Sequence, residues 1–331
     1  MSIWYRRLLW FATGLTLLVV VLGAYVRLTD AGLGCPDWPG CYGQLIPEFI
    51  DADDAATQYP ARPLESGKAW REMVHRYAAS TLGFVIILIA LLALRNRHLP
   101  EQPVALPLLT LAVVVFQGLL GMWTVTLLLK PVVVMGHLLG GLTTLSLLFW
   151  LLLEERRCIP SEREYRRVAM PAAIALVVLI GQIALGGWTS SNYAALACPD
   201  LPTCLGQWWP QEADFSEGFI MWRGLGVDYE FGVLEAPARV AIHVMHRLGA
   251  VLATLTIGGV ALGYALKYRD WPPMRLAATA VGAALLAQVS LGLATVWFGL
   301  PLPVATAHNA VAAVLLLTVI NLNNLASRAP E

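Results

Sequence analysis

Charged residues are scarce in this sequence. Asp, Glu, Lys and Arg make up 13% of its 331 residues, whereas soluble domains carry roughly 25%. The 22 basic and 22 acidic residues cancel, so the chain lacks the cationic surface with which proteins bind DNA or RNA. With 58% apolar residues and a mean hydropathy of +0.65, the composition excludes a soluble enzyme and a disordered chain, and it predicts a membrane protein.

Cysteine and targeting signals are also sparse. Five cysteines are too few for a disulfide scaffold. The first apolar run spans some 19 residues, longer than the core of a signal peptide, and no cleavage site follows it, so we expect a retained helix. No Arg- and Ser-rich transit segment is present, which favours a bacterial plasma membrane over an organelle.

The sequence contains many long apolar runs. A membrane helix needs about 20 mostly apolar residues. Eight such stretches occur, at about 8–27, 73–94, 105–129, 132–153, 170–189, 240–266, 275–298 and 303–325. The sequence therefore predicts an all-α integral membrane protein with eight transmembrane helices.

The basic residues predict how these helices are oriented. Of the 22 lysines and arginines, 13 fall on the side of the two termini. The remainder lie mostly in two long connections, at about 28–72 and 190–239. Because positive charge accumulates on the cytoplasmic side, both termini are expected in the cytoplasm and the long connections outside.

An internal repeat divides the chain. The motif from Cys35 to Cys41 returns 163 positions later, from Cys198 to Cys204. Three further pairs repeat at an offset of 171: His75 and His246, Arg76 and Arg247, and His137 and His308. Eight extra residues in the second outer connection account for the change of offset.

The repeat predicts two tandem four-helix bundles. An even number of helices in each copy inserts both copies in the same orientation, so a pseudo-twofold axis is expected along the membrane normal. We expect an N-terminal half at residues 1–155, a cytoplasmic linker at 156–168 and a C-terminal half at 169–331.

Four histidines in the spans are the main functional signal, because ionisable groups inside membrane helices are costly. They form two pairs, His75 with His137 and His246 with His308, each separated by 62 residues. A hydrogen bond between helices is the simpler explanation for any one of them, but not for a duplicated set. Zinc usually takes four protein ligands, whereas haem iron needs only two axial ones. The pattern predicts two bis-histidine haem sites, one in each half.

Arg76 and Arg247 directly follow the first histidine of each pair. A guanidinium group suits a carboxylate, so both are candidate partners for haem propionates. The alternative is that they extend to the membrane interface.

Glu72 breaks the symmetry of the repeat. It lies three residues before His75, on the same helical face, and its counterpart in the second half is His243. A carboxylate beside a haem can move protons, although an acid near a helix start is also favoured by the helix dipole. His243 leaves two candidates for the second site's ligand, and the repeated His-Arg pair favours His246.

The outer cysteines form two close pairs, Cys35 with Cys41 and Cys198 with Cys204. An oxidising compartment permits a disulfide in each pair. Two interpretations stay open: both are local structural bridges, or the Cys35–Cys41 pair is redox-active near the first haem.

Together these residues resemble the heme A synthase family, over nearly the whole chain. The resemblance rests on the two halves, both cysteine pairs, and the segments Glu72–Arg76, Gly136–His137, His246–Gly249 and Ala307–Asn309. It implies oxidation of the C8 methyl of haem O to the formyl group of haem A, through successive hydroxylations and loss of water from a geminal diol.

The resemblance also implies roles and partners. His75 and His137 would hold the haem O substrate with Glu72 as the catalytic group, and His246 and His308 would hold a permanent haem b for electron transfer. Heme O synthase, cytochrome oxidase assembly factors, membrane lipid and an unidentified electron acceptor are the expected partners, with no nucleic acid.

Two other functions compete with this one. The first is a diheme b-type cytochrome that carries electrons between quinol and an acceptor, and the second is a repeat-built transporter. An acid in only one half and the cysteine-bearing connections favour the enzyme over the carrier, and the transporter lacks broken helices at mid-membrane. The sequence gives the longer, acidic second outer connection no role.

Overall fold

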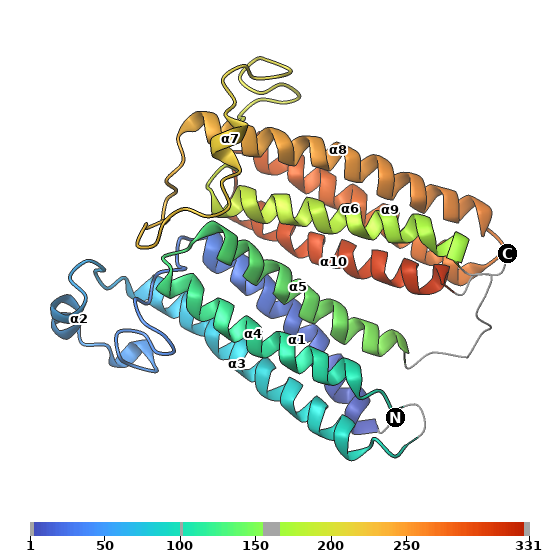
Figure 1. Ribbon diagram of the computed structural model, residues 1–331, viewed down its shortest axis with the longest axis horizontal. Coiled ribbons are helices and arrows are strands. Elements are labelled where there is room, and N and C mark those ends of the chain that lie inside the picture. Colours follow the sequence, from blue (N-terminus) through green and yellow to red (C-terminus); the bar gives the residue numbers. More distant parts are fainter. Residues whose placement is uncertain (1–2, 100–101, 155–165, 328–331) are drawn as a thin grey trace. The chain divides into compact units, whose positions relative to one another are not determined.

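The computed structural model of the chain describes residues 3–99, 102–154 and 166–327. These residues form helices joined by loops, with no strand among them (Figure 1). Two isolated β-bridges, Cys41 with Gln44 and Cys204 with Gln207, close the two cysteine loops.

Eight of the helices in the described residues are long and apolar enough to cross a membrane. They are α1 (Ile3–Leu28), α3 (Ser66–Arg95), α4 (Ala105–Thr126), α5 (Pro131–Glu154), α6 (Arg166–Ser191), α8 (Ala236–Lys267), α9 (Pro272–Trp297) and α10 (Leu302–Ala326). Short elements lie in the long connections: η1 (Pro47–Phe49), α2 (Ala52–Gln58) and α7 (Phe215–Gly218). The all-α fold with eight spans is confirmed, and it fits a multi-pass membrane protein.

Several helices begin earlier than the apolar runs predict. Helix α3 starts at Ser66 and α8 at Ala236, before the predicted starts at about 73 and 240. The added turns of α3 pack against a loop: Ala69 is fully buried and contacts Cys35 and Cys41 of the first cysteine loop. Hydropathy marks only the apolar part of a helix, so it misses turns that pack against a loop.

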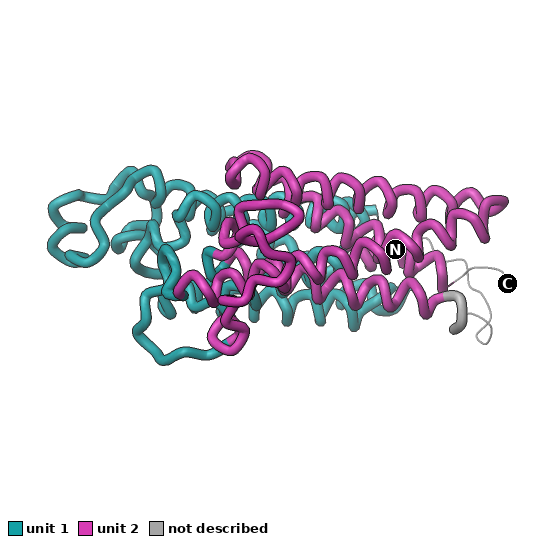
Figure 2. Tube along the Cα trace, turned by 90° about the horizontal axis from the view of Figure 1, so that it is seen from above, with its two compact units in different colours: residues 1–148, 191–193, 220–234 teal, residues 149–190, 194–219, 235–331 magenta. Residues whose placement is uncertain are grey.

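Contacts within the described chain separate it into two compact units (Figure 2). Unit 1 comprises residues up to Leu148 together with 191–193 and 220–234, and unit 2 comprises 149–190, 194–219 and the residues from Glu235 onward. In unit 1, α3 packs against α1 and α4; in unit 2, α9 packs against α8 and α10. The linker predicted at 156–168 falls largely on residues 155–165, which lie outside the described residues.

Residues 220–234 belong to the second outer connection in sequence but to unit 1 in space. We call this segment the strap. Figure 2 draws it in the colour of unit 1. The extra residues that change the repeat offset fall between Pro210 and His243, the stretch that contains the strap.

The two cysteine loops are built alike. The predicted disulfides Cys35–Cys41 and Cys198–Cys204 are both present. Asp37 accepts hydrogen bonds from the N–H groups of Tyr42 (2.6 Å) and Gly43 (2.9 Å), and Asp200 does the same for Leu205 (2.6 Å) and Gly206 (3.0 Å). Gly43 and Gly206 have φ values of +75° and +74°, a conformation that glycine adopts without steric cost.

Asp200 provides a pH test of this loop. Its hydrogen bond from the Thr203 hydroxyl and those from the loop N–H groups favour the ionised form and lower its pKa to about 2. Because the folded-state pKa is depressed, its contribution to loop stability is full above the ordinary aspartate pKa of roughly 4 and is lost as the pH falls toward 2. NMR titration of the Asp200 carboxyl carbon should give a midpoint near 2, and Thr203→Ala should raise it. A midpoint near 4 in the unmodified protein would contradict the hydrogen-bonded arrangement.

Candidate functional site

The two predicted histidine pairs are each brought together. In unit 1, His75 on α3 and His137 on α5 lie close enough to interact electrostatically. In unit 2, His246 on α8 and His308 on α10 do the same. Each pair therefore joins two helices of one bundle, as two axial ligands of a haem must.

Each imidazole packs against a glycine of a neighbouring helix. A Cβ added to Gly23 would lie 3.0 Å from Cε1 of His75, and one added to Gly186 would lie 3.2 Å from Cε1 of His246. Gly121 and Gly292 stand in the same relation to His137 (3.5 Å) and His308 (3.1 Å). A larger residue at most of these positions would push the ring aside.

The glycines repeat at the same two offsets as the motifs. Gly23 and Gly186 are 163 positions apart, and Gly121 and Gly292 are 171 apart. Gly23 and Gly186 were not predicted as site residues, because isolated glycines are common in membrane helices. Their spacing of 163 positions, equal to the repeat offset, is the signal that identifies them.

Glutamines orient three of the four rings. The Gln117 amide, turned with its nitrogen toward His137, donates to Nδ1 at 2.7 Å and to the backbone carbonyl at 3.1 Å. Gln288 lies 3.3 Å from Nε2 of His308. Gln182 lies 3.0 Å from Nδ1 of His246. An outer-shell partner of this kind fixes the orientation of a metal-ligating imidazole.

His75 has no glutamine partner and is hydrogen-bonded instead with the backbone of Val19. The position that corresponds to Gln182 in the first half is Val19, and Nδ1 of His75 is buried without a hydrogen bond. The two halves therefore differ in the side-chain support that they give to His75 and to His246.

Glu72 lies in the second turn of α3 and is 4% exposed. Its Oε2 accepts the N–H of Cys35 at 2.9 Å, and its Oε1 is hydrogen-bonded by Arg76. Because α3 starts six residues earlier, the helix-start explanation for this acid does not hold. The carboxylate is instead fixed by a charged partner and a loop peptide, about one helical turn before His75 on α3.

His243 takes the structural place of Glu72 in unit 2. Its Nδ1 accepts the N–H of Cys198 at 3.1 Å, and the residue is only 3% exposed. His246 instead is partly exposed and faces His308. This geometry favours His246 over His243 as the ligand, because His243 is already committed to the cysteine loop.

Arg76 and Arg247 both reach the cysteine loops. Arg76 donates to the carbonyls of Asp37 (3.0 Å) and Gly40 (2.5 Å). Arg247 donates to the carbonyls of Thr203 (2.7 Å) and Cys198 (2.6 Å). Each arginine therefore secures the cysteine loop of its own unit, and pairing with propionates stays a prediction.

The residues fit a haem in each unit. The donor set is two imidazoles on facing helices, and buried Nδ1 atoms of His75 and His308 lack hydrogen-bond partners. In the described part of the chain, no three His, Cys, Asp or Glu side chains gather as a metal-ion site would require. Paired imidazoles alone suit an iron that carries its own equatorial nitrogens.

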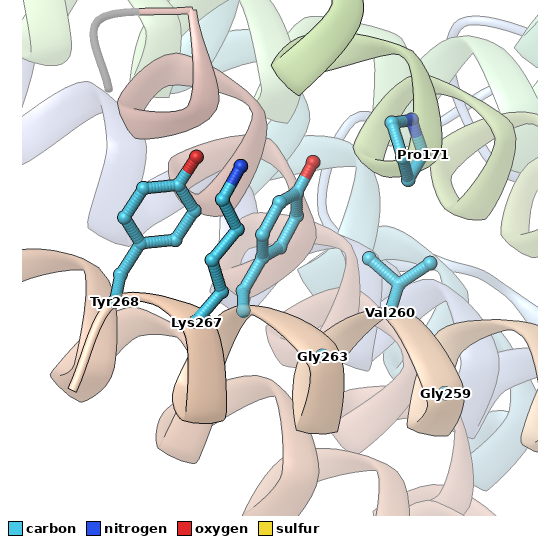
Figure 3. Close-up of a pocket in the computed structure, with 7 residues that line it drawn as sticks. Pro171, Gly259, Val260, Gly263, Lys267 and Tyr268 are labelled. Carbon is cyan, nitrogen blue, oxygen red and sulfur yellow. The ribbon is translucent and has the colours of Figure 1, made fainter. Parts of the chain in front are cut away.

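A separate hollow lies in unit 2, far from the histidines. It has a volume of about 420 Å³ and lies between Pro171 of α6 and the last turns of α8 (Figure 3). Lys267 and Tyr268 line it. At 1.5 Å per residue, Lys267 is roughly 30 Å along α8 from His246, so the hollow is no part of the histidine site.

Comparison with known proteins agrees with this geometry. A family model described as cytochrome oxidase assembly protein matches residues 6–320. The chain belongs to this family. It is 46% identical over 315 residues to a heme A synthase of Shewanella oneidensis, covering 93% of this chain and 92% of that protein. It is 28% identical to a heme A synthase of Rhizorhabdus wittichii, covering 91% and 88%, and 30% identical to one of Chelativorans sp., covering 95% and 88%.

The attachment of the first cysteine loop can be tested at Arg76. Cys35 and Cys41 are fully buried, and Arg76→Ala removes the guanidinium that bonds the loop carbonyls. Losing a charged hydrogen bond costs about 1.5–3 kcal/mol, so we expect a water-soluble phosphine to reduce this disulfide at least about tenfold faster. Thiol labelling and mass spectrometry measure the rate.

Two controls accompany this measurement. The Cys198–Cys204 disulfide, held by Arg247, should keep its rate in the same molecule. Arg71→Ala should have no effect, because the Nε of Arg71 bonds Gly67 of its own helix. Equal reduction rates of Cys35–Cys41 in the Arg76 variant and the unmodified protein would refute the attachment.

Proposed function

We propose that this protein oxidises the C8 methyl group of haem O to the formyl group of haem A. Family membership and relatives named heme A synthase support the activity. The observation that carries the proposal is an asymmetry: two similar histidine pairs, of which only the first has a fixed carboxylate, Glu72, beside it. Neither the comparisons nor the described residues favour the diheme electron carrier over this enzyme.

The two pairs take different roles in this proposal. His75 and His137 bind the haem O substrate, and His246 and His308 bind a haem b. That haem b, when bound, supplies electron transfer. The side-chain support of His246 by Gln182 suits a ligand that holds a permanent group, whereas His75, which has no glutamine beside its Nδ1, suits a ligand that must release its product.

Glu72 is the proposed proton acceptor. Turning a methyl group into a formyl group is a four-electron oxidation that breaks C–H bonds and introduces one oxygen atom. The electrons leave to the electron acceptor, and a positioned carboxylate can take up protons that are released. Arg76 and the Cys35 N–H hold the carboxylate in one place through these steps. In unit 2, His243 keeps the equivalent loop contact without adding an acid.

The same proposal includes the location of the protein in the cell and its partners. The protein lies in the bacterial plasma membrane with both termini in the cytoplasm, and its cysteine loops and haem sites lie toward the outer face. It receives haem O from heme O synthase and delivers haem A toward cytochrome oxidase assembly. Arg76 and Arg247 are candidate partners for propionates, and the Cys35–Cys41 disulfide is either structural or redox-active.

Acid extraction of the haems from protein purified in mild detergent tests the proposal, with Glu72→Gln as the variant. The unmodified protein should contain haem b together with haem O, haem A or a hydroxylated intermediate, identified by chromatography and mass. Glu72→Gln should retain haem but form formyl haem about 10²–10⁴-fold more slowly, the usual scale for loss of a proton-transfer group.

The matched control is Glu48→Gln, which removes an exposed acid of η1 in the same connection and should leave product formation unchanged. Haem b alone, at two per chain even with haem O supplied, would indicate an electron carrier. Normal formyl production by Glu72→Gln would remove Glu72 from the reaction.

The ligand assignment in unit 2 has its own test. His246→Ala should lose the low-spin b-type absorption spectrum, because one axial ligand is gone. His243→Ala should keep that spectrum, since His243 contacts the Cys198 loop instead. The reverse result, with the spectrum lost only in His243→Ala, would exchange the two roles.

A further inference from the structure

The strap, residues 220–234, is attached to unit 1 at two places. The first is Arg62, whose guanidinium forms ion pairs with Asp228 and Glu230. The Arg62 and Glu230 side chains are 21% and 12% exposed, so water screens this pair less than a surface pair. Next to it, Lys68 Nζ lies 5.9 Å from the ring centre of Phe231.

The second attachment is at the turn between α4 and α5. Lys130 is 2% exposed; its Nζ donates to the carbonyl of Gly224 at 2.9 Å and lies 3.7 Å from the ring centre of Trp222. A buried ammonium group needs such partners. The N–H of Tyr229 donates to the carbonyl of Leu128 at 3.0 Å.

The Tyr229 side chain completes a small apolar cluster. It is 3% exposed and packs with Leu33, Val125 and Leu129. Val125 is one helical turn from Gly121, the glycine against which His137 packs. This end of the strap therefore rests on the helices that carry one of the paired histidines.

The other part of the strap, at Glu230 and Phe231, lies near the start of α3, the helix that carries Glu72. Lys68 is one helical turn before Glu72 on α3. A cavity of about 220 Å³ lies here, lined by Gly34, Arg62, Lys68, Glu230 and Phe231 among others. Gly34 precedes Cys35, whose N–H bonds Glu72. The strap thus spans the loop end of the first site, from the His137 side to the Glu72 side.

In the described residues, the strap groups with the unit that contains the first site. The whole of the first outer connection groups with its own unit 1, whereas the strap is contributed to unit 1 by the second half of the chain. A permanent group does not need a removable cover. A substrate that passes through several oxidation states does need to be retained between them.

We propose that the strap forms the loop-side wall of the first haem site and retains the partly oxidised haem until the formyl group is complete. This inference rests on the proposed function. Arg62 and Lys130 are its positioning residues: they hold the wall and take no part in the oxidation. Weakening the wall raises the dissociation rate of the intermediate, which is where most changes in affinity appear.

The test compares Arg62→Gln with the unmodified protein in detergent. Protein supplied with haem O is mixed with excess apo-globin, which captures any released haem, and the captured haems are identified by mass. We expect the released share of hydroxylated intermediate to rise at least about tenfold, the scale of one charge-assisted contact. The b-type spectrum of the second site should not change.

The matched control is Glu212→Gln. It removes an exposed acid from the same connection, outside the strap, and should leave intermediate release unchanged. Asp228→Asn combined with Glu230→Gln should reproduce the effect of Arg62→Gln, because it removes the other side of the same ion pairs.

Hydrogen exchange of the Tyr229 amide reports strap opening independently of activity. Faster exchange with greater release is expected in Arg62→Gln. Faster exchange with unchanged release would overturn the retention role. If the Tyr229 amide exchanges at the unmodified rate both in Arg62→Gln and in the double variant Arg62→Gln with Lys130→Met, these two residues do not attach the strap. If the unmodified protein makes no formyl haem, the proposed function fails, and release of unmodified haem O still tests the wall.

Discussion

The contact of Glu72 with Arg76 and the Cys35 peptide is the constraint on which the first site depends. A carboxylate among apolar helices is costly unless both oxygens have partners. Here one oxygen takes the guanidinium and the other takes the loop N–H. The remaining donors of Arg76 reach carbonyls of the same loop. Helix, loop and disulfide are thereby fixed together, and the acid is held beside the histidines as a result.

The second unit has the same arrangement of helix, cysteine loop, arginine and histidine pair, but with different residues at two positions. His243 replaces the acid but keeps the loop contact, and Gln182 occurs where the first half has Val19. The first change removes an acidic group from the second unit, and the second change adds a side-chain partner for His246. Under the proposed function, the first unit's residues suit proton transfer and the second unit's residues suit a permanently bound group.

The sequence predicted what depends on composition and on the repeat. Apolar runs determine the eight spans, and the duplicated His75–His137 pattern identified residues that the fold brings together. It did not predict the early start of α3, because those turns are stabilised by packing against a loop rather than by lipid. Nor did it predict the strap, since the partners of Arg62 lie more than 160 residues away and no local pattern encodes that contact.

The buried Lys130 has a consequence for how the chain is made. Its ammonium group has its carbonyl partner at Gly224 and its aromatic partner at Trp222, which the ribosome adds more than 90 residues later. Until then, the first four spans are in place but one cation at the α4–α5 turn lacks its partners. The N-terminal bundle is therefore finished only after α6 has been synthesised. The first half of the chain thus depends on a segment of the second half to complete its buried polar contacts.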